Sequence, residues 1–153
     1  MKRQRLNWQE KVRKNVRKIM DFEHVKAVFE EYLNGYDREN DKVKLKIVHT
    51  YGVMKYAGEI ARKMECSGED VELAELIGLL HDIGRFEQLK RFNSFEADTM
   101  DHATYGVKVL FEEGMIRQFI EEDTWDDVIR TAIAKHSDYE LTGITDERTL
   151  LHA

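Results

Sequence analysis

The chain contains no proline among its 153 residues, and this absence constrains its fold more than any other feature of the sequence. Proline interrupts helices, so a chain without it can form long ones. No segment shows Val, Ile and Thr alternating with polar residues between turn signals, which is the pattern typical of strands. With 42% hydrophobic residues the chain can bury one core of modest size. The sequence therefore predicts an all-α fold, a single-domain bundle of about six helices.

Apolar residues recur at helical spacing in several stretches of the chain. The predicted helices span residues 21–34, 41–66, 69–83, 101–113 and 124–136, and a last helix is expected to start near residue 145. In the longest of them the apolar positions run from Val43 to Met64 in steps of three and four, which predicts a continuous seam on one face.

Residues that commonly begin or end helices mark several of these boundaries. Gly35, Gly84 and Gly114 each follow a predicted helix, as helix-ending glycines do, and Thr124 is a predicted N-cap. Residues 85–100 remain as a long loop, and loops of that length in compact domains often carry function.

Positive charge is concentrated at the start of the chain, where residues 1–19 hold eight Lys and Arg against one acidic residue. We predict a basic extension at 1–19 followed by a domain at 20–153. The extension is interpreted as a solvated helix, with RNA, a membrane surface or an acidic partner as alternative contacts. The whole chain has a net charge of -6, so no general affinity for nucleic acid is expected.

The single cysteine, Cys66, cannot form an internal disulfide. No stretch of the sequence is long and apolar enough to span a bilayer, and the N-terminus lacks the pattern of a secretory signal. A cytoplasmic location without a membrane partner is therefore expected.

Four of the six histidines lie on or beside apolar stripes of predicted helices: His49, His81, His102 and His136. A single inward histidine is most often a core residue that bonds to a backbone carbonyl. Four from separate helices would cost much desolvation unless something binds their lone pairs, and a metal ion does so. We interpret all four as metal ligands.

Asp82 directly follows His81, at the end of a predicted apolar helix. Adjacent side chains on a helix point about 100° apart, so this pair can hold one ion between them, or the carboxylate can bridge two ions. Gly84 is expected to end the helix and open the site. Asp82 is therefore predicted to be both a metal ligand and a catalytic residue.

This arrangement resembles the HD superfamily of metal-dependent phosphohydrolases over about residues 21–153. The resemblance implies that His49 and His81 ligate one ion, that His102 and His136 ligate a second, as in the dinuclear branch, and that Asp82 bridges them. The segments that carry it are His49-Thr50, Leu79-Leu80-His81-Asp82-Ile83-Gly84-Arg85, Asp101-His102-Ala103 and Ala134-Lys135-His136.

Imidazole and carboxylate ligands suit iron, manganese, cobalt, nickel or zinc, so the expected cofactor is one or two divalent ions of this group. The expected substrate is a small phosphorylated molecule such as a nucleotide, hydrolysed at a phosphoester or phosphoanhydride bond by a metal-activated water. Arg85 is predicted as a catalytic phosphate contact because a guanidinium can bind two phosphate oxygens. Weaker phosphate-binding predictions, each with an exposed solubilising charge as the alternative, are Lys46, Lys90, Arg91 and Lys135.

Asp101 beside His102 has two interpretations, a helix N-cap or a carboxylate that fixes the imidazole tautomer. The chain also departs from the HD pattern. The family closes its first metal site with an aspartate on a later helix, and Asp138 and Asp146, the only aspartates after His136, do not fall where that ligand should. Gly52 stands where many relatives carry a basic residue. These departures favour an alternative function, a degenerate HD module that binds a nucleotide or partner without turnover.

Residues 145–153 show a helix start and apolar positions but no stop signal, so we expect the domain to be C-terminally truncated or shortened. Extending the chain by its natural downstream residues should raise metal occupancy and the phosphatase rate, because that helix would supply the last carboxylate. Metal analysis and rate assays on both proteins test this expectation. Equal occupancy and equal rates would contradict it.

Overall fold

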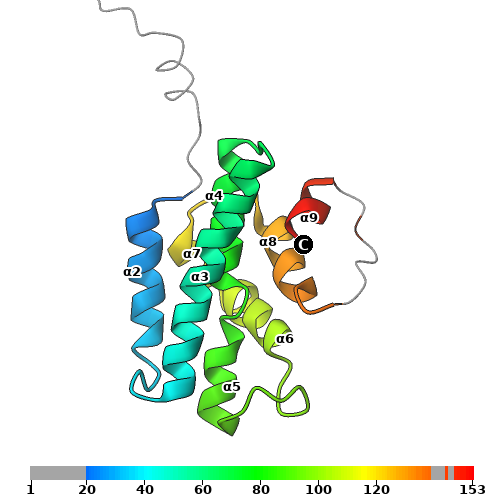
Figure 1. Cartoon of the computed structure of the whole chain (residues 1–153). Coiled ribbons are helices and arrows are strands. Elements are labelled where there is room, and N and C mark those ends of the chain that lie inside the picture. Colours follow the sequence, from blue (N-terminus) through cyan, green and yellow to red (C-terminus); the bar gives the residue numbers. More distant parts are fainter. Residues whose placement is uncertain (1–19, 139–143, 145–146) are drawn as a thin grey trace, which may run out of the picture.

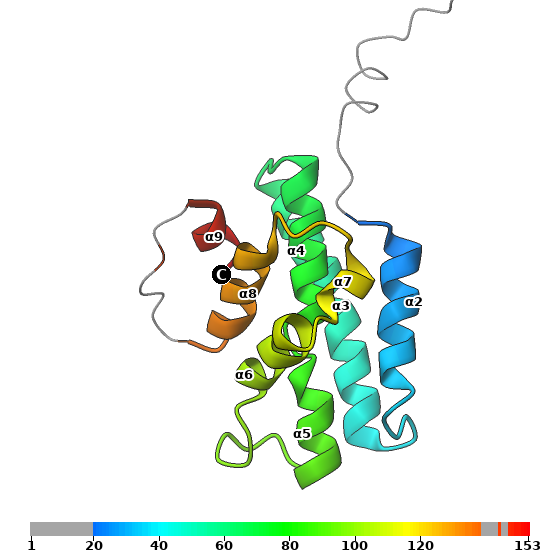
Figure 2. The ribbon, with the colours of Figure 1, turned by 180° about the vertical axis from the view of Figure 1, so that it is seen from behind.

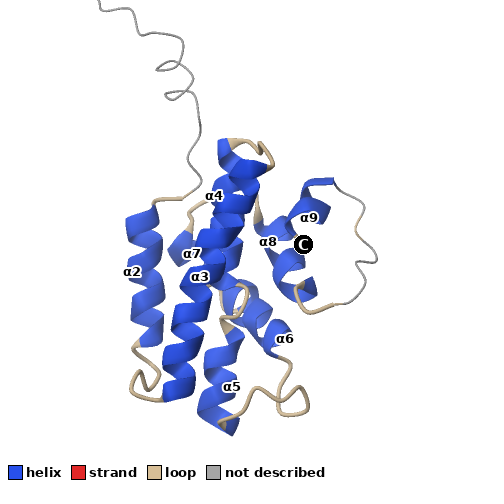
Figure 3. Ribbon diagram, in the orientation of Figure 1, coloured by secondary structure: helices blue, strands red, loops and turns tan. Residues whose placement is uncertain are grey.

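The computed structural model describes residues 20–138, 144 and 147–153, and within these it contains helices and connecting loops but no strand (Figure 3). The predicted all-α class is confirmed. The basic extension at 1–19 and the predicted start of the last helix, Thr145 and Asp146, lie outside the described residues. No helix of the described part is long and apolar enough to cross a membrane.

Two capped helices open the described chain. Helix α2 (Phe22–Leu33) begins where the Asp21 side chain accepts hydrogen bonds from two backbone amides, and it buries Phe29 completely. Helix α3 (Asp41–Lys63) begins in the same way at Asn40. The two helices lie side by side (Figure 1), and the ring of Phe29 meets that of Tyr51 edge-on.

Helix α4 (Gly68–Leu80) is the central helix of the bundle, because residues 76–80 are buried on every side. It forms its most extensive contact with α3, at the position of Gly78. A Cβ atom on Gly78 would lie 2.9 Å from the Cα of Met54, so the two backbones approach as closely as they do only because residue 78 has no side chain. The predicted seam of α3 is buried along most of its length, but Met64, at its end, is exposed.

The prediction of a loop at 85–100 is wrong over the first half of that range, where the chain forms helix α5 (Gly84–Phe92). Gly84 begins this helix and does not stop the preceding one. Phe86 and Leu89 supply its buried face, and Asn93 ends it in the left-handed conformation with φ of 48°. The spacing of these two apolar residues before an asparagine was the available signal for the helix.

A helix at 101–113 is confirmed, although its hydrogen bonding changes along its length. Asp101 caps α6 (His102–Val107), which continues as the π-helix η1 (Lys108–Glu112) and ends before Gly114, whose φ is 79°. The short helix α7 (Ile116–Phe119), not predicted, then turns the chain towards α2 (Figure 2).

Helix α8 (Asp126–Lys135) starts later than predicted, and Trp125 instead of Thr124 occupies its N-cap, without a side-chain capping bond. Helix α9 (Glu147–His152) packs against α8 and α4. Asp70, in the first turn of α4, binds α9 by accepting hydrogen bonds from Arg148 (2.8 Å) and His152 (3.0 Å). His152 is therefore held against Asp70 at the end of α9.

Alanine substitutions at two glycines on adjacent helices are expected to change the free energy of unfolding in opposite directions. Gly78→Ala should destabilise the protein by about 1–3 kcal/mol, because the new methyl group would press against backbone atoms of Met54 that cannot turn aside. Gly52→Ala should instead stabilise it by roughly 0.5–1 kcal/mol, since Gly52 is inside α3 and a Cβ there would meet nothing within 4 Å. Urea unfolding of both variants measures the two effects. Similar changes in the free energy of unfolding would refute the close approach of α3 and α4.

Candidate metal centre

Asp82 lies in the turn between α4 and α5, just beyond the helix in which it was predicted. His81 is the C-cap of α4, and the turn continues through short-range bonds from the Ile83 amide to the Leu80 carbonyl (3.1 Å) and from the Arg85 amide to the Asp82 carbonyl (2.9 Å). The Asp82 side chain is buried. This turn therefore places a carboxylate inside the bundle, where the ends of several helices meet.

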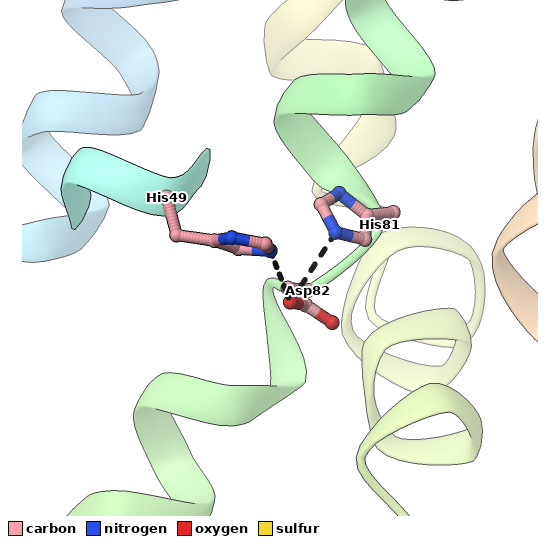
Figure 4. Close-up of side chains that lie close together, drawn as sticks. All are labelled: His49, His81 and Asp82. Carbon is pink, nitrogen blue, oxygen red and sulfur yellow. Dashed lines mark ion pairs between the residues drawn. The ribbon is translucent and has the colours of Figure 1, made fainter. Parts of the chain in front are cut away.

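The four predicted histidines all reach this carboxylate. The Nε2 atoms of His49 and His81 lie 3.6 and 3.2 Å from Oδ2 of Asp82, and Figure 4 shows both rings directed at it. The Nε2 atoms of His102 and His136 lie 3.4 and 3.2 Å from Oδ1. The five side chains form two groups that share Asp82, and within each group the ligand atoms all lie within 4.8 Å of one another.

His102 reaches the site because α5 and α6 begin almost in contact. A Cβ atom on Gly84 would overlap with the carbonyl oxygen of His102 and would lie 3.1 Å from the amide nitrogen of Gly106. The glycine after the His-Asp pair is therefore required by this close approach and not by a helix end. Asp101 acts as the N-cap of α6 by accepting a hydrogen bond from the Thr104 amide, at 3.1 Å.

Backbone carbonyls fix the tautomers of two of the rings. Nδ1 of His81 donates to the Gly78 carbonyl and Nδ1 of His136 donates to the Ile133 carbonyl, both at 2.6 Å, since a carbonyl can only accept. In the neutral ring Nε2 then presents its lone pair to an oxygen of Asp82. Two electron-rich atoms that face each other need either a proton on the ring or a metal ion between them. The donor set therefore fits a divalent metal ion.

The pKa values of these side chains are shifted by burial and by their contacts with one another. Burial raises the pKa of Asp82, but hydrogen bonds from His102, His136 and His81 outweigh it and hold that pKa well below its usual range. Burial lowers the pKa of His136, yet its bonds to Asp82 and to the Ile133 carbonyl raise the pKa overall. For His49, burial and the nearby charge of Lys46 lower the pKa, which favours the neutral ring that a metal needs.

Two of the predicted phosphate-binding residues lie at the site. Nζ of Lys46 is 3.0 Å from Oδ2 of Asp82, and Lys46 and Arg85 line the same cleft as Asp82, a cavity of about 660 Å³. No pattern in the sequence marked the residue whose ring contacts both of them. Phe95, in the loop after α5, has its ring centroid 5.0 Å from Nζ of Lys46 and 5.5 Å from the guanidinium carbon of Arg85.

The structure does not bring the other three predicted phosphate-binding residues to this cleft. Lys90 lies over the ring of Tyr36, Arg91 pairs with Glu87 at 2.9 Å, and Lys135 pairs with Asp138 at 3.6 Å. Each of the three side chains therefore interacts with a nearby residue outside the cleft.

Comparison with known proteins gives one family and two relatives. The HD domain family matches residues 47–152. Ribonuclease Y of Acetivibrio thermocellus is 30% identical over 143 residues, which cover 88% of this chain and 24% of that protein. Ribonuclease Y of Alkaliphilus metalliredigens is 29% identical over 139 residues, covering 86% and 26%. The chain thus spans about a quarter of the length of these relatives, and no solved structure matches it significantly.

Removing the shared carboxylate tests whether the cluster holds metal. We expect Asp82→Ala to lose most of the divalent transition metal that the unmodified protein retains after dialysis, because both ligand groups include Asp82. His24→Gln is the matched control, since His24 is an exposed histidine outside both groups. Plasma emission spectrometry measures the metal, and circular dichroism verifies the fold. A folded Asp82→Ala protein with undiminished metal would rule out this site.

Proposed function

The chain belongs to the HD domain family, and from this we propose that it is a metal-dependent phosphohydrolase that cleaves a phosphoester or phosphoanhydride bond in a nucleotide or related small molecule. The observation that carries the proposal is the convergence of four imidazoles on the buried carboxylate of Asp82, beside two cationic side chains in one cleft. Ligands for a cation and contacts for an anion therefore occupy neighbouring positions. Phosphoryl transfer needs both.

Two ions can be accommodated by the two ligand groups. His49, His81 and Asp82 would hold the first, and Asp82, His102 and His136 would hold the second. Nitrogen and oxygen ligands of this kind suit iron, manganese, cobalt, nickel or zinc. When bound, such ions supply Lewis acidity, which lowers the pKa of a water molecule and offsets negative charge on the phosphoryl oxygens.

The protein's own side chains bind and orient the substrate. Lys46 supplies a positive charge that is mostly buried and 3.0 Å from Asp82, where it can contact a phosphoryl oxygen at the mouth of the cleft. Arg85 supplies a second cation on the same wall. Asp82 stays ionised, because its pKa is held low, and it therefore provides a fixed negative charge beside Lys46.

A second candidate function is hydrolysis of a phosphodiester in RNA. The two matched relatives favour it, because both bear the name ribonuclease Y. The same metal ligands and phosphate contacts could act on an internal phosphodiester. Binding of a nucleotide without turnover, as in a degenerate HD module, is the third possibility.

A substrate panel separates these functions. The metal-loaded protein would be incubated with nucleoside mono-, di- and triphosphates, with a dinucleoside polyphosphate and with a short single-stranded RNA, and products would be resolved by chromatography. Chelator-treated protein and Asp82→Ala are the controls. Release of phosphate or a nucleotide from the small molecules alone supports the first proposal, cleavage of RNA supports the second, and binding without any product supports the third.

Arg85→Ala should keep the metal and lose transition-state binding. We expect kcat/KM to fall by roughly 10- to 100-fold, the range for losing hydrogen bonds to a charged group, because Arg85 cannot ligate a metal but can bind phosphate. Arg62→Ala provides the control, since Arg62 is a surface arginine paired with Glu75. Steady-state rates and metal analysis measure both effects. Wild-type kcat/KM in Arg85→Ala on every hydrolysed substrate would exclude the assigned role.

A further inference from the structure

The guanidinium of Arg85 is held at one of its nitrogens. Nη1 donates to Oε1 of Gln88 at 2.8 Å and to the carbonyl oxygen of Phe95 at 3.1 Å. Nε, by contrast, is buried and has no hydrogen-bond partner among the described residues. Leaving a buried donor on a charged group unpaired is costly, so Nε would gain from an acceptor, which can reach it once the atoms that cover it move aside.

The geometry of guanidinium decides which acceptor fits. Nε–H and one N–H of Nη2 point in the same direction within the plane, and this edge matches two oxygens of a carboxylate or phosphate. The bonds at Nη1 leave that edge without a hydrogen-bond partner among the described residues, although its Nε atom is covered. The ring of Phe95 packs against the guanidinium at 5.5 Å and restricts its rotation out of the plane.

Gln88 connects Arg85 to the loop that leads to His102. Its side chain is completely buried. While Oε1 accepts from Arg85, Nε2 donates to the Glu96 carbonyl and to Oγ1 of Thr99, both at 3.0 Å. The loop from 93 to 101 ends at the N-cap of α6, where His102 begins the helix. One amide therefore fixes both the arginine and the segment that precedes a predicted metal ligand.

We propose that Gln88 is a positioning residue of the phosphate subsite: it holds Arg85 by Nη1 in the wall of the cleft and so keeps the Nε–Nη2 edge for two non-bridging oxygens of a phosphoryl group, whose binding would uncover Nε. The inference rests on the proposed function, because that function supplies the phosphoryl group. Nothing in the sequence marked Gln88, which stands among charged neighbours on α5. Its burial and its bonds in opposite directions distinguish it from a solvated glutamine.

Coupling between Gln88 and Arg85 tests the proposal. Inorganic phosphate would be titrated calorimetrically into the Mn²⁺-loaded protein, into Gln88→Met, into Arg85→Ala and into the double variant. Methionine has a similar volume but cannot make the amide hydrogen bonds. We expect Gln88→Met to weaken phosphate binding about tenfold, and to change it less than about twofold when Arg85 is already alanine, because the residue acts through Arg85.

Two controls separate positioning from a general effect on folding. Gln118→Met changes an exposed glutamine on α7 and should leave phosphate affinity unchanged. Metal content and thermal melting would be measured for every variant. If Gln88→Met does not fold, Gln88→Asn takes its place, since it keeps an amide but withdraws it from Arg85, and the same coupling is expected.

The outcomes distinguish this inference from the proposed function. Equal weakening of phosphate binding with and without Arg85 would show that Gln88 acts through the fold, and an unchanged affinity would show that it positions nothing. Either result overturns the inference while leaving the phosphohydrolase proposal intact. Absence of phosphate binding by the unmodified, metal-loaded protein would instead contradict the proposed function, and the inference would fall with it.

Discussion

The carboxylate of Asp82 is a negative charge held away from water, and the arrangement of the surrounding helix ends depends on how that charge is compensated. A buried, unpaired carboxylate would cost several kcal/mol, which is a large share of the stability of a small domain. Here the compensation comes from α3, α6 and α8 as well as from the neighbouring His81, through His49, Lys46, His102 and His136. The helices therefore meet at Asp82 for an electrostatic reason, in addition to burying apolar side chains elsewhere.

That convergence is possible only because backbones approach closely at glycines. Gly78 brings α4 against α3, which carries His49, and Gly84 brings the start of α5 against the start of α6, which carries His102. In both places a Cβ atom would meet backbone, which cannot change rotamer to make room. The apolar interior of α4 and these two contacts thus set the positions of ligands that are far apart in the sequence.

Much of the fold and the central residues of the site could be predicted from local sequence. The apolar spacing from Val43 gave α3, and the inward placement of His81, His102 and His136 followed from helical periodicity. The prediction failed where a residue type has two structural uses. Gly84 was interpreted as a helix end, although it begins α5 and serves a close contact between helices. Gln88 and Phe95 gave no signal, because their roles depend on contacts across a loop whose conformation no spacing rule describes.

Exposure sets His49 apart from the rest of the cluster, and this difference indicates how a substrate would approach. The side chain of His49 is 49% exposed, whereas those of His81, His102 and His136 are 13%, 10% and 17% exposed. His49 also lies beside Leu45 and Val48, which are exposed on the same helix, so this side of the cluster faces solvent and not the core, contrary to its expected inward position.

An ion held by His49 and His81 would exchange ligands with solvent more readily than one enclosed by His102 and His136. A phosphoryl group entering from the His49 side would come close to Lys46, and Arg85 lines the same cleft. On the proposed function, the exposed His49 side would admit the substrate while the buried ligands keep Asp82 fixed.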